Sequence, residues 1–124
     1  MEDIRMNFPL EKAYNVAGHT ETQVINRLRL FAAITGVSIV ELPDGYVNIS
    51  AIDEAVNSLM KDDWKKVITE MFGLDGNDTK TLEEVAPILK VTPERVRQIE
   101  WKVIKILRTP QRLSLLNVEG KEEF

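Results

Sequence analysis

The sequence has no cysteine and a single histidine, His19. Without cysteine the chain has no disulfides and no thiolate ligands for a metal. One histidine cannot build a His-based zinc site alone, and a lone histidine in a polar stretch is usually just solvated, so His19 receives no role. A glycine-rich phosphate loop and a nucleophile with a histidine base are also missing. We therefore expect no metal, no cofactor and no enzymatic activity.

Long apolar runs are absent as well. No run approaches the roughly 20 residues that span a bilayer. The first residues, M-E-D-I-R-M-N, are acidic and lack the basic-then-apolar order of a signal peptide. With 124 residues, of which 44% are apolar and 29% are charged, the chain can bury a real core. We expect a soluble cytoplasmic protein that does not enter the membrane.

An excess of positive charge is missing too, because the net charge is −4. The charge is uneven, however. Residues 74–112 carry eight Lys and Arg against six Asp and Glu, or +2, and the remaining residues carry eight against fourteen, or −6. A mildly basic module inside an acidic chain fits local contact with phosphates. It also fits ordinary scatter, so charge alone does not decide.

Helical patterns account for most of the chain after Thr20. The capping-box pattern T-E-T-Q, from Thr20 to Gln23, begins a helix whose apolar residues recur at helical spacing up to Gly36, a glycine suited to end it. Residues 1–19 have no clear periodicity and indicate a loop or a short helix around Leu10–Val16. Residues 1–49 as a whole resemble no known family.

Two β-rich runs, V-S-I-V-E-L and Y-V-N-I, flank the turn residues P-D-G. This pattern suggests a small hairpin over residues 37–49. A lone two-stranded hairpin is marginally stable, so it must pack on another element or pair with a partner.

From Ser50 onward the pattern predicts four helices joined by short loops. Ser50 can cap the first, which carries Ile52, Val56, Leu59 and Met60, and the second runs from about Asp62 to Phe72 and ends at Gly73. A capping box from Thr81 to Glu84 begins the third, and Thr92 with Pro93 begins the fourth. We expect a mainly α protein with an accessory or partner-binding segment at 1–49, a helical domain at 50–116 and a frayed tail at 117–124.

The third and fourth helices have the spacing of a helix-turn-helix. On the fourth, apolar residues share one side (Val96, Ile99, Val103, Ile106 and Leu107) and polar residues share the other (Glu94, Arg97, Gln98, Lys105 and Arg108). In the major groove, Arg can make a bidentate contact to guanine, Gln can make one to adenine, and Glu can accept a hydrogen bond from cytosine. Lys102, Lys105 and Arg108 can neutralise phosphates. A polar side of this kind is, however, more often only solvated.

Four segments of residues 62–112 resemble region 4 of the housekeeping bacterial sigma-70 family: F-G-L-D, T-L-E-E-V, V-T-x-E-R-V-R-Q-I-E and K-x-L-R-x-P, in the family's order and spacing. The resemblance implies that the fourth helix contacts the promoter −35 element and that the module binds the flap tip of the RNA polymerase β subunit. Candidate DNA-binding residues are Thr92, Glu94, Arg95, Arg97, Gln98, Lys102 and Lys105. Candidate polymerase- or partner-binding residues are Phe72, Ile99, Trp101, Ile104, Leu107, Arg108 and Leu116.

Three residues depart from the family pattern. Pro93 stands where the family has an arginine that contacts a −35 guanine, which removes about 1–3 kcal/mol of base discrimination. Trp101 replaces a small residue in the middle of the polar side, where it either anchors a protein partner or folds back onto a neighbouring helix. Pro87 lies inside the third helix and favours a kink. These changes predict altered, weakened or lost −35 recognition.

Nothing in the sequence resembles the segment with which sigma factors open the −10 element. Three hypotheses follow. The chain is a stand-alone region 4 that works with a separate region 2-like sigma subunit, a region 4 mimic that binds polymerase or another factor without specific DNA contact, or a homodimeric helix-turn-helix repressor.

Overall fold

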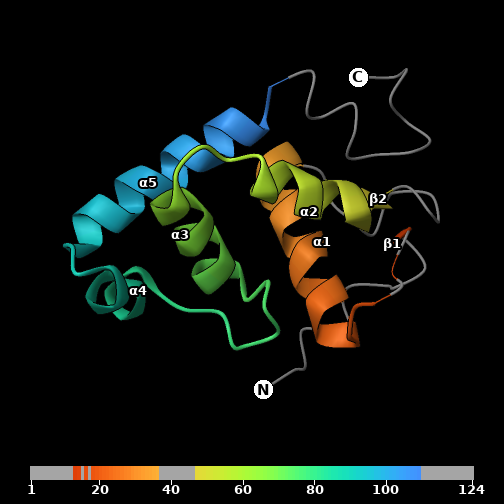
Figure 1. Cartoon of the computed structure of the whole chain (residues 1–124), viewed down its shortest axis with the longest axis horizontal. Helices are drawn as coiled ribbons and strands as arrows, with labels where there is room; N and C mark the ends of the chain where they lie inside the picture. The colour runs from red at the N-terminus through yellow and green to blue at the C-terminus, as the bar shows by residue number, and fades with distance from the viewer. Residues whose placement is uncertain (1–12, 15, 17, 37–46, 110–124) are drawn as a thin grey trace.

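Five helices form most of the computed structural model, which describes residues 13–14, 16, 18–36 and 47–109 (Figure 1). Two strands of two residues each, β1 (Ala13–Tyr14) and β2 (Val47–Asn48), pair in parallel. None of the described helices has the length and apolarity to cross a bilayer. The mainly α fold predicted from the sequence is confirmed. The helices are α1 (Glu21–Thr35), α2 (Ile49–Asn57), α3 (Asp62–Phe72), α4 (Leu82–Leu89) and α5 (Pro93–Leu107).

The predicted helix ends are confirmed in four of the five helices. The hydroxyls of Thr20, Thr81 and Thr92 each accept a hydrogen bond from the backbone N–H three residues on, at 3.1–3.2 Å. These bonds satisfy donors that the first turn of a helix leaves unpaired. Gly36 and Gly73 end α1 and α3 in the left-handed conformation, which glycine adopts without steric cost.

The predicted start of α2 was wrong. Asn48, not Ser50, caps this helix, and its side-chain oxygen accepts from the N–H of Ala51 at 3.1 Å. Asparagine is at least as good a cap as serine, and capping two residues earlier brings Ile49 into the core. The helix ends at Asn57, so Met60 lies beyond it and is 91% exposed instead of packing with the apolar side.

Within the described residues, the strand that contains Val47 and Asn48 is not paired as the predicted hairpin requires. Val47 pairs with Ala13 and Asn48 with Tyr14, so this strand joins the N-terminal segment in parallel. The first predicted strand and the P-D-G turn lie outside the described residues. The alternative of a helix around Leu10–Val16 was wrong at Ala13–Tyr14, which are extended because they pair with β2.

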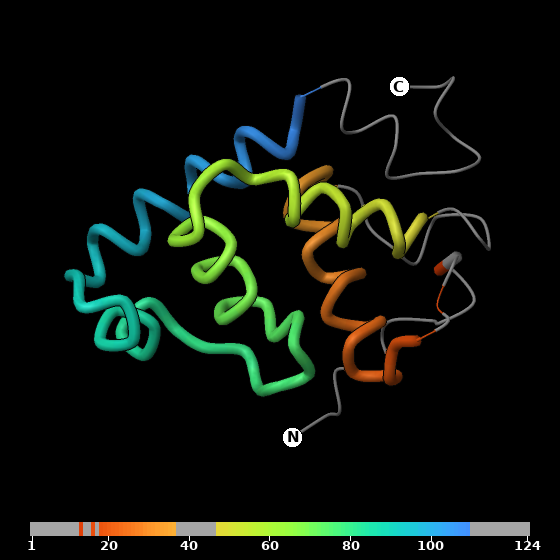
Figure 2. The backbone as a smooth tube through the Cα atoms, viewed as in Figure 1, coloured from red at the N-terminus to blue at the C-terminus, as the bar shows by residue number. Residues whose placement is uncertain are grey.

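One hydrophobic core joins all five helices, and α1 packs on α2, α3 and α5 (Figure 2). Its Leu28, Leu30 and Phe31 are completely buried. The buried Asn26 side chain donates to the carbonyl of Gly73 at 2.9 Å, which ties α1 to the end of α3. The predicted segments 1–49 and 50–116 therefore contribute to a single core, and this core fixes α5 in place.

Candidate nucleic-acid interface

The turn between α4 and α5 is closed by backbone hydrogen bonds. The N–H of Val91 donates to the carbonyl of Ala86 at 3.1 Å, and the N–H of Lys90 donates to that of Pro87 at 3.2 Å. This pair of bonds is a Schellman motif, with Lys90 in the left-handed position at φ 58°. The helix α4 continues through Pro87 to Leu89, so the proline removes one hydrogen bond from the helix without ending it.

The two sides of α5 agree with the sequence pattern. Val96, Ile99, Val103 and Leu107 are buried, and the contacts of α5 are mainly with α3 and α4. The opposite side is exposed along the whole helix and carries the polar residues Glu94, Arg95, Arg97, Gln98, Lys102 and Lys105. The core thus holds α5 with its polar side toward solvent, which is the placement that a groove-binding helix needs.

Arg97 is bonded within its own helix. Its Nε donates to Glu94 Oε1 at 3.0 Å and its Nη2 donates to Glu94 Oε2 at 2.5 Å. The Arg97 guanidinium lowers the pKa of the Glu94 carboxyl, and Glu94 in turn raises the pKa of Arg97. Both side chains are exposed, and exposed ion pairs are weak. The pair uses two of the five guanidinium N–H donors, and an incoming acceptor could compete for Arg97.

Trp101 does not fold back onto a neighbouring helix, because its side chain is 66% exposed in the middle of the polar side. The Lys105 ammonium lies 5.3 Å from the centre of its ring. Two shallow hollows, of about 720 and 350 Å³, share Arg97, Trp101 and Lys105 in their walls. The indole is therefore an exposed apolar surface among cations.

A second indole lies close to this side of α5. The ammonium groups of Lys61 and Lys102 are each 5.4 Å from the centre of the Trp64 ring, at the start of α3. Cation–π contacts of this kind hold long lysine side chains in place. Lys102, which also lines the larger hollow beside Trp101, is therefore held toward Trp64.

The remaining predicted site residues lie in different environments. The Thr92 hydroxyl is used as the helix cap. Phe72 and Ile104 are partly buried, Ile99 and Leu107 are buried in the core, and Leu116 lies outside the described residues. Arg108 donates to the carbonyls of Ile34 and Ala33, at 2.7 and 3.2 Å, and so binds the end of α1. As placed, Ile99 and Leu107 do not present side chains to a partner.

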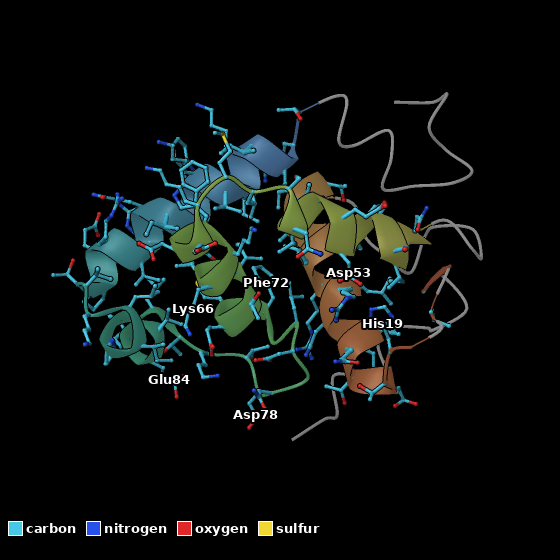
Figure 3. The ribbon with its side chains drawn as sticks, in the orientation of Figure 1. His19, Asp53, Lys66, Phe72, Asp78 and Glu84 are labelled. Carbon is cyan, nitrogen blue, oxygen red and sulfur yellow. The ribbon has the colours of Figure 1, made fainter. Side chains whose placement is uncertain are left out.

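His19 is not a solvated side chain, so that prediction was wrong. Its Nε2 lies 2.7 Å from Asp53 Oδ2, and the Arg27 Nε donates to Asp53 Oδ1 at 2.7 Å. Figure 3 shows His19 and Asp53 beside each other between α1 and α2. The cluster joins the segment before α1 to both helices, and no local sequence pattern relates residues 19, 27 and 53. Among the described residues no three His, Asp or Glu side chains converge as a metal site.

The comparisons with known proteins converge on the helical module. Residues 58–109 match the family described as Sigma-70, region 4. The RNA polymerase sigma factor SigA of Lactococcus lactis subsp. cremoris is 42% identical over 77 residues, covering 60% of this chain and 21% of that protein. SigA of a Nostoc species is 39% identical over 75 residues, covering 52% and 19%. The chain thus spans about a fifth of the length of these relatives. No solved structure matches it.

Proposed function

We propose, from the premise that residues 58–109 are a sigma-70 region 4 domain with a helix-turn-helix fold, that this chain is a stand-alone region 4 factor. In this proposal it binds the β flap of bacterial RNA polymerase in the cytoplasm and places α5 on upstream, −35-like promoter DNA. A separate region 2-like sigma subunit supplies the opening of the −10 element. The similar proteins are named as RNA polymerase sigma factors, which supports the polymerase as the partner.

The observation that carries the proposal is the orientation of α5. Its buried side is fixed by α3 and α4, and its polar side is exposed from Glu94 to Lys105. The major groove of DNA is wide enough for one α-helix. The fold therefore supports insertion of this helix with Gln98 toward the bases, where an amide can bond the N6 and N7 of adenine.

Contacts to the DNA backbone would position the helix. Arg95 and Lys102 are exposed on the same side of α5 as Gln98, at spacings that suit phosphates along the groove. Thr92 would contribute from the start of the helix, where the positive end of the helix dipole favours phosphates. Because Pro93 has no side-chain donor, we expect weaker base discrimination than in the housekeeping family.

The polymerase contact would use the apolar edge of the same domain. Phe72 and Ile104 are only partly buried, and they occupy positions that the family uses for the flap. Exposed apolar side chains are what a flap contact requires, since protein interfaces bury apolar groups at their centre.

A gel shift with core polymerase and a duplex that carries a −35-like element tests the proposal. Arg97→Ala combined with Gln98→Ala should weaken the shift at least about tenfold, since each bidentate base contact contributes about 1–3 kcal/mol. Lys66→Ala combined with Asn57→Ala removes the same two kinds of group from exposed sites on α3 and α2, and should leave the shift unchanged.

Equal shifts for the two double variants would reject DNA contact through α5. Failure of the full chain to co-purify with core polymerase, or with its isolated flap, would reject the polymerase part of the proposal. The two measurements are independent, so each part can fail alone.

A further inference from the structure

Trp101, Arg97 and Lys105, together with the two hollows that they share, form a surface that the region 4 family pattern does not explain; we call it the Trp101 surface. Five large apolar side chains are exposed among the described residues: Val16, Met60, Ile88, Val91 and Trp101. Trp101 is the one of these on the polar side of α5. An exposed tryptophan bordered by polar groups is typical of a protein-binding site.

The walls of the larger hollow combine apolar and positive groups. Ile106 and the indole of Trp101 supply apolar walls, and Arg95, Lys102 and Lys105 supply charges at the rim. The aliphatic stems of lysine and arginine add to the apolar area. All of these residues come from α5 or directly follow it, so the hollow is open and a partner side chain would lie on the indole.

The charge of the Trp101 surface is strongly one-sided. Residues 93–109 contain five Lys and Arg against two Asp and Glu. Of the two carboxylates, Glu94 is already bonded to Arg97, and Glu100 is partly buried. A partner of complementary charge must therefore bring carboxylates or phosphates.

The chemistry of the indole favours a protein over DNA bases at this point. A base edge in the major groove needs several donors or acceptors, but an indole offers one N–H donor and an apolar ring. The same ring and the hollows beside it fit aliphatic or aromatic side chains, which make up the centre of protein interfaces. Lys105 beside the ring, with Arg95 and Lys102 at the rim, can then pair with carboxylates.

We infer that the Trp101 surface binds an acidic segment of another protein, with an apolar side chain of that segment in the larger hollow and its carboxylates on Lys102, Lys105 and Arg95. The segment covers Gln98, which lines the same hollow, so the acidic partner and promoter DNA exclude each other on α5. The competition with DNA rests on the proposed function, whereas the docking itself does not.

Fluorescence anisotropy with three labelled 12-residue peptides tests the docking on the full-length chain. One peptide combines Glu with Leu and Phe at helical spacing, one keeps the Glu but replaces the apolar residues by Ser, and one replaces Glu by Lys. We expect the first to bind at least about tenfold more tightly than the others. Trp101→Ala should remove that advantage, because truncating a central tryptophan is typically a large loss. Met60→Ala, an exposed apolar residue outside α5, is the matched control.

Several outcomes overturn the inference. Equal binding of the acidic peptides with and without apolar residues would mean charge attraction alone. Equal binding by wild type and Trp101→Ala, with circular dichroism showing both folded, would place the site elsewhere. A single-stranded oligonucleotide that binds through Trp101 more tightly than the acidic peptide would identify nucleic acid as the occupant. A dimer in sedimentation that Trp101→Ala dissociates would identify a second copy of the chain.

The competition with DNA needs a separate experiment. The acidic apolar peptide should displace the −35-like duplex from the wild-type complex, and Trp101→Ala should keep the gel shift while resisting the peptide. If the wild type never shifts the duplex but still binds the peptide through Trp101, the proposed function fails and the docking stands. If the duplex shifts and a peptide that binds through Trp101 does not displace it, the exclusion between partner and DNA fails, whereas the docking and the proposed function stand.

Discussion

The contacts made by single side chains on α5 cannot be derived from helical periodicity alone. The pattern places Arg97 and Glu94 together on the polar side, but it leaves open whether they contact DNA or each other. In the structure they bond each other. Arg108 continues the same side by periodicity, yet it reaches back to the end of α1. Local sequence defines which side of a helix a residue occupies, and the tertiary fold defines what it contacts.

Glu100 offers a pH-dependent test at this scale. Burial raises the pKa of its carboxyl, so the neutral form is favoured in the folded state, and ionisation costs stability as pH rises through the folded pKa. We expect Glu100→Gln to be more stable than wild type at pH 7.5, with no difference well below the usual glutamate pKa. Thermal melts at pH 7.5 and near pH 3 measure this, with the exposed Glu54→Gln as the control. A wild type that is the more stable at pH 7.5 would contradict the prediction.

Arg108 tests the contact between the ends of α5 and α1. Its guanidinium donates to two carbonyls of the last turn of α1, where a cation also complements the helix dipole. Arg108→Gln should lower the free energy of unfolding by about 1–2 kcal/mol, measured by urea denaturation. Lys66→Ala removes an exposed cation from α3 and should have little effect. Equal stabilities of the two variants would show that the bonds to α1 contribute nothing.

At the scale of elements, helix boundaries were predictable wherever a capping pattern marked them. The helices α1, α3, α4 and α5 begin or end at the threonines and glycines that the sequence indicated. The start of α2 was missed because Asn48 and Ser50 are both good caps, and burial of Ile49 decides between them. The strands Ala13–Tyr14 and Val47–Asn48 are too short for a period of two to appear, and their pairing joins distant parts of the chain.

The turn between α4 and α5 gives a prediction about an element. Lys90 is the one non-glycine residue with positive φ among those described, and this conformation costs an L-residue about 1–2 kcal/mol. Lys90→Gly should raise the free energy of unfolding by about 0.5–1 kcal/mol, because part of the gain is lost to the greater freedom of glycine in the unfolded chain. Lys90→Val should lower it, since branching at Cβ makes the conformation harder to reach. Urea denaturation of the three proteins measures both, and an order other than Gly, Lys, Val would contradict the account.

At the scale of the whole molecule, the candidate site depends on a helix outside the matched family region. Residues 58–109 carry the family pattern, and the polar side of α5 was predictable from them. The position of α1 was not, because its amphipathic pattern indicates that it packs without indicating on which partners. It packs on α2, α3 and α5, and through Asn26 and Arg108 it is bonded to the ends of α3 and α5.

This arrangement predicts that residues 47–124 do not fold stably alone. Five apolar side chains of α1 are buried in the common core: Val24, Leu28, Leu30, Phe31 and Ile34. Each contributes about 1.5–3 kcal/mol, so together they are comparable with the whole net stability of a domain, about 5–15 kcal/mol. A fragment that starts at Val47 should lose its cooperative thermal transition, and with it the polymerase binding that we propose. Asn26→Ala in the full chain removes one buried bond and should cost only about 1–3 kcal/mol while keeping the transition. Cooperative unfolding of the fragment, at a stability close to that of the full chain, would instead make α1 a separable accessory and leave α2–α5 as an independent domain.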